Sequence, residues 1–179
     1  MLRFESRNFI LLSFLIIILN QCPAQEIPDT VIINNYKTAV KTQADSMIFW
    51  LQTNQFEKYI HVHHPGLIKA LGGEKNLQAE LTKSFVTRGM QVISYVNNIP
   101  EKFIISESNI QCVFSQIQLM KLNFKKVEIS STIIAISYDI GKTWYFINTG
   151  GMSRELLKQI LPEINDGLII PPQKTVSRE

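Results

Sequence analysis

The hydrophobic pattern of this chain changes its period once, near residue 90, and the change limits the folds open to it. Before that point apolar side chains recur every three or four residues, as on one side of an α-helix. After it, the segments are rich in β-branched and aromatic residues, as β-strands are. Helices followed by consecutive strands predict an α+β domain, with N-terminal helices packed on one face of a strongly twisted antiparallel sheet.

The longest predicted helix covers residues 30–51, and three shorter helical segments should follow it before the change of period. Thr53 or Asn54 is expected to cap the second helix, and Pro65 to end or kink it. One more helix, capped by Ser153, is expected after the strands. The apolar positions of the longest helix are Tyr36, Val40, Ala44, Met47, Ile48 and Leu51.

Five strands are predicted after the change of period, and two of them are long, about ten residues each. Long neighbouring strands joined by tight turns form antiparallel pairs. The C-terminal tail is expected to add a short edge strand. The five predicted strands are residues 92–97, 102–106, 110–119, 127–138 and 143–148.

The first 24 residues have the layout of an export signal. Arg3 and Arg7 precede an apolar run of eleven residues, which is shorter than the roughly 20 residues that span a bilayer as a helix. A cleaved signal peptide is therefore expected, with Cys22 and Ala24 as the small residues before the cleavage site. The mature chain, residues 25–179, would then be a single domain in the periplasm or outside the cell, with no transmembrane anchor.

The alternative is a lipoprotein anchored through Cys22. The three residues before Cys22, Leu19-Asn20-Gln21, lack the small side chain that a lipoprotein peptidase prefers next to the cysteine. Signal cleavage removes Cys22 and leaves Cys112 as the single thiol, so no disulfide can form within the chain. Cys112 lies in an apolar run and is predicted to be buried and unreactive.

The charge of the mature chain is small. Removing the first 24 residues takes away two arginines and one glutamate, which leaves 16 basic against 14 acidic residues and a net charge of +2. That is too little for nucleic-acid binding by bulk charge, and the cluster Lys121, Lys125 and Lys126 is too short to alter this. We therefore expect no nucleic-acid partner.

A turn motif lies between the last two predicted strands. The letters "GKT" do not form a phosphate loop, because the glycine five residues earlier and the helix after the loop are both missing. The sequence Ser137-x-Asp139-x-Gly141-x-Thr143-Trp144 instead resembles the Asp-box of sialidases and other β-propeller proteins. One copy in so short a chain cannot build a propeller. We interpret these five residues as a structural hairpin turn, in which the aspartate accepts backbone N–H groups and the glycine takes a positive φ.

Several landmarks along the mature chain resemble those of small secreted bacterial proteins of the NTF2-like, cystatin-like α+β class. They are Phe56 to Tyr59, His64-Pro65, Gly72-Gly73 and Ser137 to Phe146. The resemblance implies a cone-shaped fold with a pocket between sheet and helices. Catalytic members of the class generally place an Asp–His or Asp–Tyr pair in that pocket. No such pair can be matched here, so no catalytic residue is carried over from the class.

All three histidines lie in the segment "HVHH". In a helix His61 and His64 would share a face, whereas in a strand His61 and His63 would do so. His61 and His64 are the candidate acid–base residues, with Asp45 or Glu57 as the carboxylate partner of His64; surface or helix-end positions are the simpler interpretation. Zinc would need at least a third ligand, and no cysteine pair or HExxH spacing supports one. We expect neither a metal nor a cofactor.

The function expected from these observations is binding, by a secreted non-enzymatic domain. The partner would be a small apolar ligand, another protein, or a second copy of the chain in a homodimer formed through the sheet. Most aromatic side chains are expected in the core, and some would line a pocket if the cone is incompletely filled. The alternative is an enzyme of the same fold that performs His/carboxylate acid–base chemistry on a small organic substrate.

Overall fold

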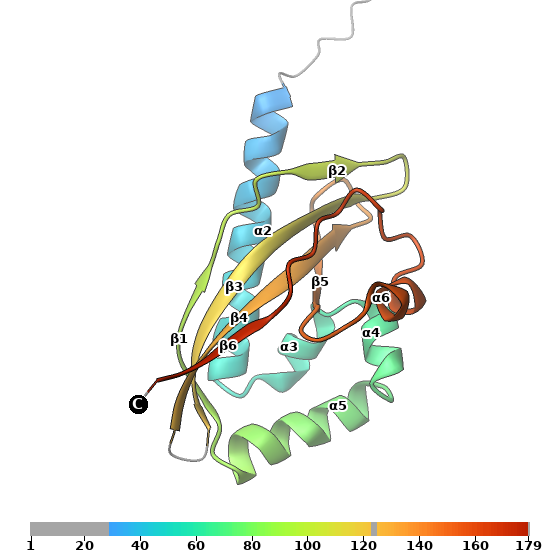
Figure 1. Ribbon diagram of the computed structural model, residues 1–179. Coiled ribbons are helices and arrows are strands. Elements are labelled where there is room, and N and C mark those ends of the chain that lie inside the picture. Colours follow the sequence, from blue (N-terminus) through green and yellow to red (C-terminus); the bar gives the residue numbers. More distant parts are fainter. Residues whose placement is uncertain (1–28, 123–124, 179) are drawn as a thin grey trace, which may run out of the picture. The chain divides into compact units, whose positions relative to one another are not determined.

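The computed structural model of the chain describes residues 29–122 and 125–178 (Figure 1). By its internal contacts the chain divides into two units, Met1–Ile32 and Ile33–Glu179. The predicted export signal, with Cys22, lies outside the described residues. Within the described part, no helix combines the length and the apolar character needed to cross a membrane.

The fold is α+β, and its helices precede its sheet as the change of period predicts. The first helices are α2 (Asp29–Gln52), α3 (Phe56–His61), α4 (Pro65–Ala70) and α5 (Glu74–Leu81), which continues into the π-helical segment η1 (Thr82–Thr87). The strands are β1 (Gln91–Asn97), β2 (Phe103–Ile105), β3 (Ile110–Leu122), β4 (Lys125–Ser137), β5 (Tyr145–Asn148) and β6 (Lys174–Arg178), with α6 (Arg154–Ile160) between the last two.

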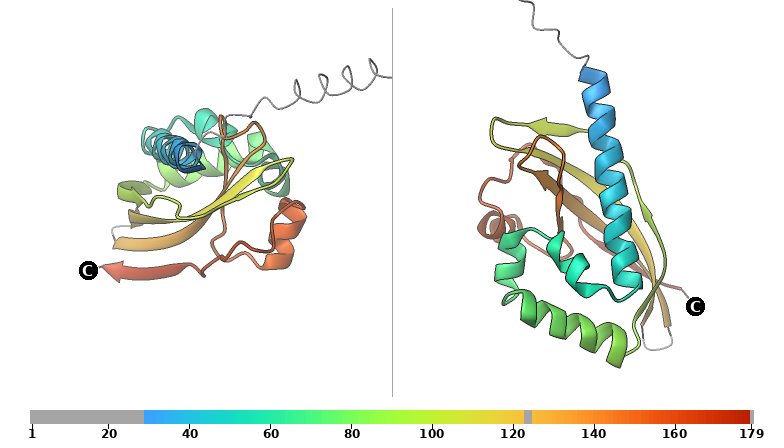
Figure 2. Two further views of the ribbon diagram at one scale, coloured as in Figure 1. Left: turned by 90° about the horizontal axis from the view of Figure 1, so that it is seen from above. Right: turned by 180° about the vertical axis from the view of Figure 1, so that it is seen from behind.

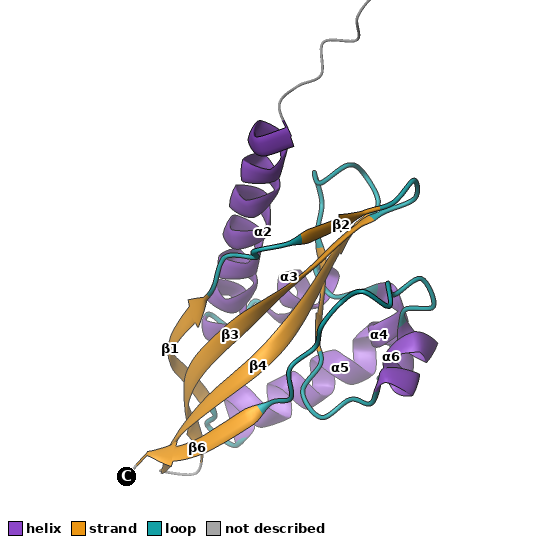
Figure 3. Ribbon diagram, turned by 45° about the horizontal axis from the view of Figure 1, so that its top comes forward, coloured by secondary structure: helices purple, strands orange, loops and turns teal. Residues whose placement is uncertain are grey.

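The six strands form one antiparallel sheet around the long hairpin of β3 and β4. These two strands have 13 residues each and pair along their whole length. Strands β1 and β2 pair with opposite ends of β3. Strand β5 pairs with residues 133–136 of β4. Strand β6 pairs with residues 126–130 of the same strand (Figure 3). The two long neighbouring strands and the edge strand in the tail agree with the sequence analysis.

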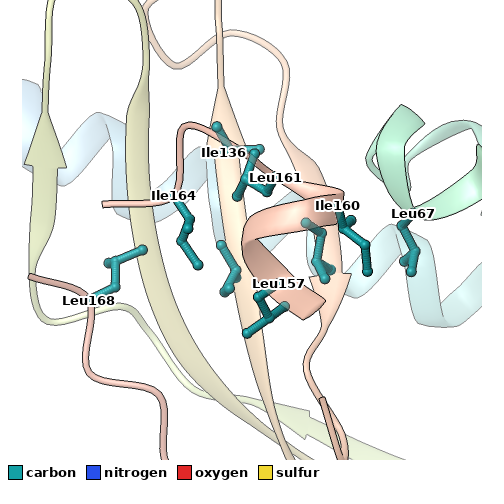
Figure 4. Packing of buried hydrophobic residues seen from close by; sticks show 9 residues of the cluster. Leu67, Ile136, Leu157, Ile160, Leu161, Ile164 and Leu168 are labelled. Atoms are coloured by element: carbon teal, nitrogen blue, oxygen red, sulfur yellow. The ribbon is translucent and has the colours of Figure 1, made fainter. Parts of the chain in front are cut away.

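The second half of β4 is buried on both faces of the sheet, whereas helices on one face only were expected. Helix α2 lies on one side of the sheet (Figure 2). Ile133 faces this side, because it lines a cavity together with Met47 and Leu51 of α2. On the opposite side, Ile134 and Ile136 pack against α6 and the segment after it (Figure 4). The unbroken apolar run around these residues is the pattern of a strand covered on both sides. The cluster on this second face is Leu67, Ile134, Ile136, Ile147, Leu157, Ile160, Leu161, Ile164 and Leu168.

The start of α3 differs from the sequence expectation. Its N-cap is Gln55, whose side chain makes no capping hydrogen bond, so the prediction of Thr53 or Asn54 as the cap was wrong. The Thr53 hydroxyl instead donates to the carbonyl of Phe49, at 2.8 Å, in the last turn of α2. Asn54 takes a left-handed conformation, with φ at 58°. Both residues therefore end the long helix, and the short one begins without a side-chain cap.

Alanine substitutions on β4 test the burial of both faces. Ile133→Ala and Ile136→Ala should each lower the free energy of unfolding by about 2–5 kcal/mol, because each removes a fully buried side chain and leaves a cavity. The control Ile169→Ala, at a side chain that is 83% exposed, should change it by less than about 0.5 kcal/mol. Urea denaturation measures all three. A loss confined to Ile133→Ala would contradict the two-sided packing.

Candidate functional site

The segment that carries the three histidines is joined to the sheet through its backbone. His63 forms a parallel bridge with Phe146 of β5. The Phe146 N–H donates to the carbonyl of Val62 at 2.8 Å, and the His64 N–H donates to the carbonyl of Phe146 at 3.2 Å. The segment is thus helical up to His61 and extended afterwards. Each histidine consequently has different hydrogen-bond partners, although His61 and His63 both line one surface groove.

His61 lies at the exposed end of α3. Its Nδ1 is 3.0 Å from the carbonyl oxygen of Glu57. Since a carbonyl oxygen only accepts, this nitrogen carries the proton. The Glu57 carboxylate takes no part in this contact, so His61 is not in an acid–base pair with it. His61 also lines an open groove on the surface.

His64 caps the start of α4 and is the centre of a short hydrogen-bond chain. Its Nδ1 accepts from the Gly66 N–H at 3.1 Å, and its Nε2 lies 2.9 Å from the Tyr138 hydroxyl. The hydroxyl of Tyr138 donates to the carboxylate of Glu163. Because Nδ1 accepts, Nε2 must be the protonated nitrogen. Both ring nitrogens are occupied, which leaves His64 no free lone pair with which to take a proton from a substrate.

The partner expected for His64 therefore has to be corrected. Neither Asp45 nor Glu57 contacts it, and the carboxylate of the chain is Glu163, reached through Tyr138. Burial lowers the pKa of His64 below its usual value, against the opposing charge of Glu163. Burial, together with the hydrogen bond and charge of Glu163, raises the pKa of Tyr138. No local sequence pattern predicts these hydrogen bonds, because Tyr138 lies 74 residues from His64 and 25 residues from Glu163.

His63, which the sequence analysis left without a role, is the buried histidine, with 6% of its surface exposed. Its Nδ1 lies 2.7 Å from the carbonyl oxygen of Tyr59, and its Nε2 makes no hydrogen bond among the described residues. Burial lowers the pKa of His63 to about 4, although the bond to Tyr59 acts in the opposite direction. His63 follows the buried Ile60 by three residues, so it continues the apolar face of α3. This spacing could have identified His63 as the buried histidine.

Two hollows meet at His63. A partly open cavity of about 60 Å³ lies between α2, α3 and the sheet, and a more open groove of about 600 Å³ lies over α3, α4, α5 and β5. The cavity is lined by Met47, Leu51, Tyr59, His63, Gln116, Gln118, Ile133, Phe146 and Asn148. The groove is lined by His61, His63, Pro65, Ile68, Lys69, Gly72, Gly73, Glu74 and Tyr145.

A chain of buried amides leads from the cavity to a surface ion pair. The Gln118 amide donates to Gln116 at 2.6 Å, Gln116 donates to Asn97 at 2.7 Å, and Asn97 donates to the Asp45 carboxylate at 2.9 Å. The other oxygen of Asp45 pairs with Lys41 at 2.6 Å. Gln116 is 1% exposed and Asn97 is 3% exposed. Buried amides without partners are costly, and the hydrogen bonds along this network offset the cost of burying Asn97 and Gln116.

The turn between β4 and β5 is held by the side chains of the Asp-box pattern. Gly141, with φ at 80°, donates to the Ser137 hydroxyl at 2.9 Å. Ser137 in turn donates to the Asp139 carboxylate, which also accepts from the Thr143 N–H at 2.8 Å. The buried indole of Trp144 donates to the carbonyl of Gly141 at 3.0 Å. All five residues have structural contacts in the turn, and none of them lines the cavity or the groove.

Among the described residues, neither Cys112 nor a cluster of possible metal ligands forms a second reactive site. Cys112 is fully buried, and burial raises the pKa of its thiol well above the usual value, so the reactive thiolate does not form. In the part of the chain that the structure describes, no three His, Cys, Asp or Glu side chains gather as metal ligands would.

Comparisons with known proteins do not assign a family. No family model, no curated protein and no solved structure matches this chain. The resemblance to NTF2-like, cystatin-like proteins therefore stays a prediction that rests on the sequence landmarks. What the site does has to be inferred from its own geometry.

The pH dependence of stability tests the burial of His63. Its pKa of about 4, against 6.5 for an ordinary histidine, means that the unfolded chain binds a proton in this range while the native chain does not. The free energy of unfolding should therefore fall as the pH is lowered from about 6.5 to 4, by up to about 3 kcal/mol from this residue. His64, whose pKa is also lowered, contributes in the same direction.

In the variant His63→Gln, the free energy of unfolding should fall less steeply as the pH is lowered, because only the contribution of His64 to this slope remains. The control His61→Gln, at an exposed position, should leave the slope as it is in the unmodified protein. Urea denaturation at a series of pH values measures each slope. Equal slopes in His63→Gln and the unmodified protein would show that His63 is not held neutral by burial.

A glycine pair tests the turn. A Cβ atom at Gly141 would lie 2.4 Å from Cδ1 of Tyr36, whereas at Gly89, with φ at 67°, it would meet nothing within 4 Å. Gly89→Ala should cost about 1–2 kcal/mol, the penalty of the left-handed conformation alone. Gly141→Ala should cost at least about 1 kcal/mol more, because Tyr36 must also move. Thermal denaturation of both variants measures the difference, and equal losses would contradict the close approach of Tyr36.

Proposed function

We propose that this protein is a non-enzymatic domain that binds a small molecule in the groove over α3, α4, α5 and β5. The observation that carries the proposal is the size of this groove, about 600 Å³, which lies within the range typical of small-molecule sites. The partly open cavity of about 60 Å³ is too small to hold a whole substrate. If the fold is an NTF2-like cone, side chains nearly fill its interior, and the ligand would bind in this outer groove instead.

The lining of the groove combines apolar surface with a few polar groups, as ligand sites usually do. Tyr145, Ile68 and Pro65 supply apolar and aromatic surface. Lys69 and Glu74, both exposed, supply one charge of each sign. This composition suits a ligand with a polar or charged end and an apolar body. The sequence analysis predicted a small apolar ligand, and the polar end is added to that prediction here.

We also propose that the protein is exported, with residues 1–24 removed as a signal peptide. The support is the order of Arg3, Arg7 and the short apolar run that follows them. Lipid attachment at Cys22 is the alternative. In either case the binding domain would work outside the cytoplasm, where a free ligand can reach the groove directly.

The alternative function is an enzyme that uses His64 as an acid–base group. The chain from His64 through Tyr138 to Glu163 favours it, since Tyr145 of the groove packs against both rings, with centroids 6.4 Å from His64 and 6.2 Å from Tyr138. Against it, both nitrogens of His64 are already hydrogen-bonded. Catalysis would require this chain to open first, so binding is the better-supported function.

Native mass spectrometry of the protein purified from its natural host tests the proposal. The unmodified protein should carry a bound small molecule that is lost on denaturation. Lys69→Glu should retain it about tenfold less, because the variant reverses a charge on the groove wall. The matched control Lys58→Glu reverses an exposed charge on α3 away from the groove.

Equal retention by both variants, or a protein without any ligand, would count against the groove as a binding site. The same spectra give the mass of the assembly, so they also test the homodimer expected through the sheet.

A further inference from the structure

The charge of Asp45 fixes the direction of the amide chain that ends at the cavity. A carboxylate only accepts hydrogen bonds, so Asn97 must present its NH₂ group to it. The carbonyl of Asn97 then accepts from the NH₂ of Gln116, and the carbonyl of Gln116 accepts from the NH₂ of Gln118. The side-chain carbonyl of Gln118 is left over. It makes no hydrogen bond among the described residues, and Gln118 lines the cavity.

A second acceptor on the same cavity is fixed in the same manner. The carbonyl oxygen of Tyr59 can only accept, so the nitrogen of His63 that contacts it, Nδ1, carries the proton. The other nitrogen, Nε2, is consequently an acceptor without a partner in the described part of the chain. His63 is buried and held neutral, so this nitrogen does not become a donor at ordinary pH.

Two donors complete the lining. The Asn148 carbonyl accepts from the Gly150 N–H at 2.9 Å, which leaves the Asn148 NH₂ group free to donate. Burial raises the pKa of Tyr59 to about 12, so its hydroxyl keeps its proton. Both residues line the cavity. Its volume, about 60 Å³, has room for a group of a few heavy atoms, since one water needs about 10–15 Å³ on this measure.

We propose that this cavity binds the carboxamide group of a ligand. The NH₂ of the amide donates to His63 Nε2 and to the carbonyl of Gln118, and its C=O accepts from Tyr59 or Asn148. A carboxylate has nearly the same shape but no hydrogen to donate, and it would bring a negative charge against two fixed acceptors. The proposal rests on the proposed function in one respect: the rest of the ligand lies in the groove, which shares His63 with the cavity.

Acetamide and acetate are matched probes for this site, and ¹⁵N NMR of the His63 ring reports on the cavity directly. Acetamide should shift the Nε2 resonance of His63 in a saturable manner, and acetate at the same concentrations should not. Gln118→Leu removes one acceptor and should weaken acetamide binding about fivefold. The control Gln78→Leu, at an exposed position on α5, should leave it unchanged.

The variant Asp45→Asn tests whether the Asp45 carboxylate sets the direction of the amide hydrogen bonds. An amide at this position can donate to Asn97, so the whole chain can turn over and present the NH₂ of Gln118 to the cavity. The preference for acetamide over acetate should then fall about fivefold or more. Lys41→Met is the matched control: it removes the ion pair but keeps the acceptor-only carboxylate, so the preference should persist.

The inference is overturned if acetate shifts the His63 resonance as strongly as acetamide, if acetamide leaves it unmoved, or if Gln118→Leu binds acetamide unchanged. These results are separate from those on the groove. A ligand retained in native mass spectra with no effect of acetamide at His63 would leave the proposed function standing and remove the cavity site. Acetamide binding in a protein that retains no groove ligand would do the reverse.

Discussion

The rest of this structure depends on the burial of the second half of β4 between two layers. Residues 133–136 pair with β3 on one side and β5 on the other, and their side chains are covered on both faces of the sheet. Helices α2 and α3 can lie on one face because α6 and the segment after it cover the other. At about 25 cal/mol per Å² of apolar surface removed from water, this strand contributes more to stability than an edge strand of equal length. It also holds the turn and β5, and through Phe146 the segment that carries the histidines.

The side-chain amides of Asn97, Gln116 and Gln118 are oriented by one charge, the carboxylate of Asp45. Asp45 belongs to α2, yet the direction of each amide bond behind it follows from its inability to donate. Buried amides in an apolar interior are tolerated when they form a connected network. In this chain the network does more than satisfy its members, because it determines which chemical groups face the cavity. The carbonyl of Tyr59 acts in the same way on His63: it can only accept, so the proton lies on Nδ1 and Nε2 is an acceptor.

Local signals in the sequence predicted much of the fold and little of the site. The change of period near residue 90 placed the helices before the strands, and the pattern from Ser137 to Trp144 described the contacts of the turn. The cover on both faces of β4 could have been read from its unbroken apolar run. The partners of His64 and Asp45 could not, because they lie 74 and 52 residues away and are brought near only by the pairing of strands. The cap of α3 was missed because Thr53 bonds back to the preceding helix.

The outer edge of β4 is divided between two short strands. Strand β6 covers residues 126–130 and β5 covers residues 133–136, while the N–H of Thr149 donates to the carbonyl of Thr132 in the interval between them. A foreign strand would meet on this side only the edges of these two short strands. The opposite edge is shared by β2, which has three residues, and β1, whose register is broken by an irregularity between Val92 and Ser94. Short edge strands and register breaks hinder the edge-to-edge addition of strands from other molecules, which matters for a chain so rich in β-branched residues.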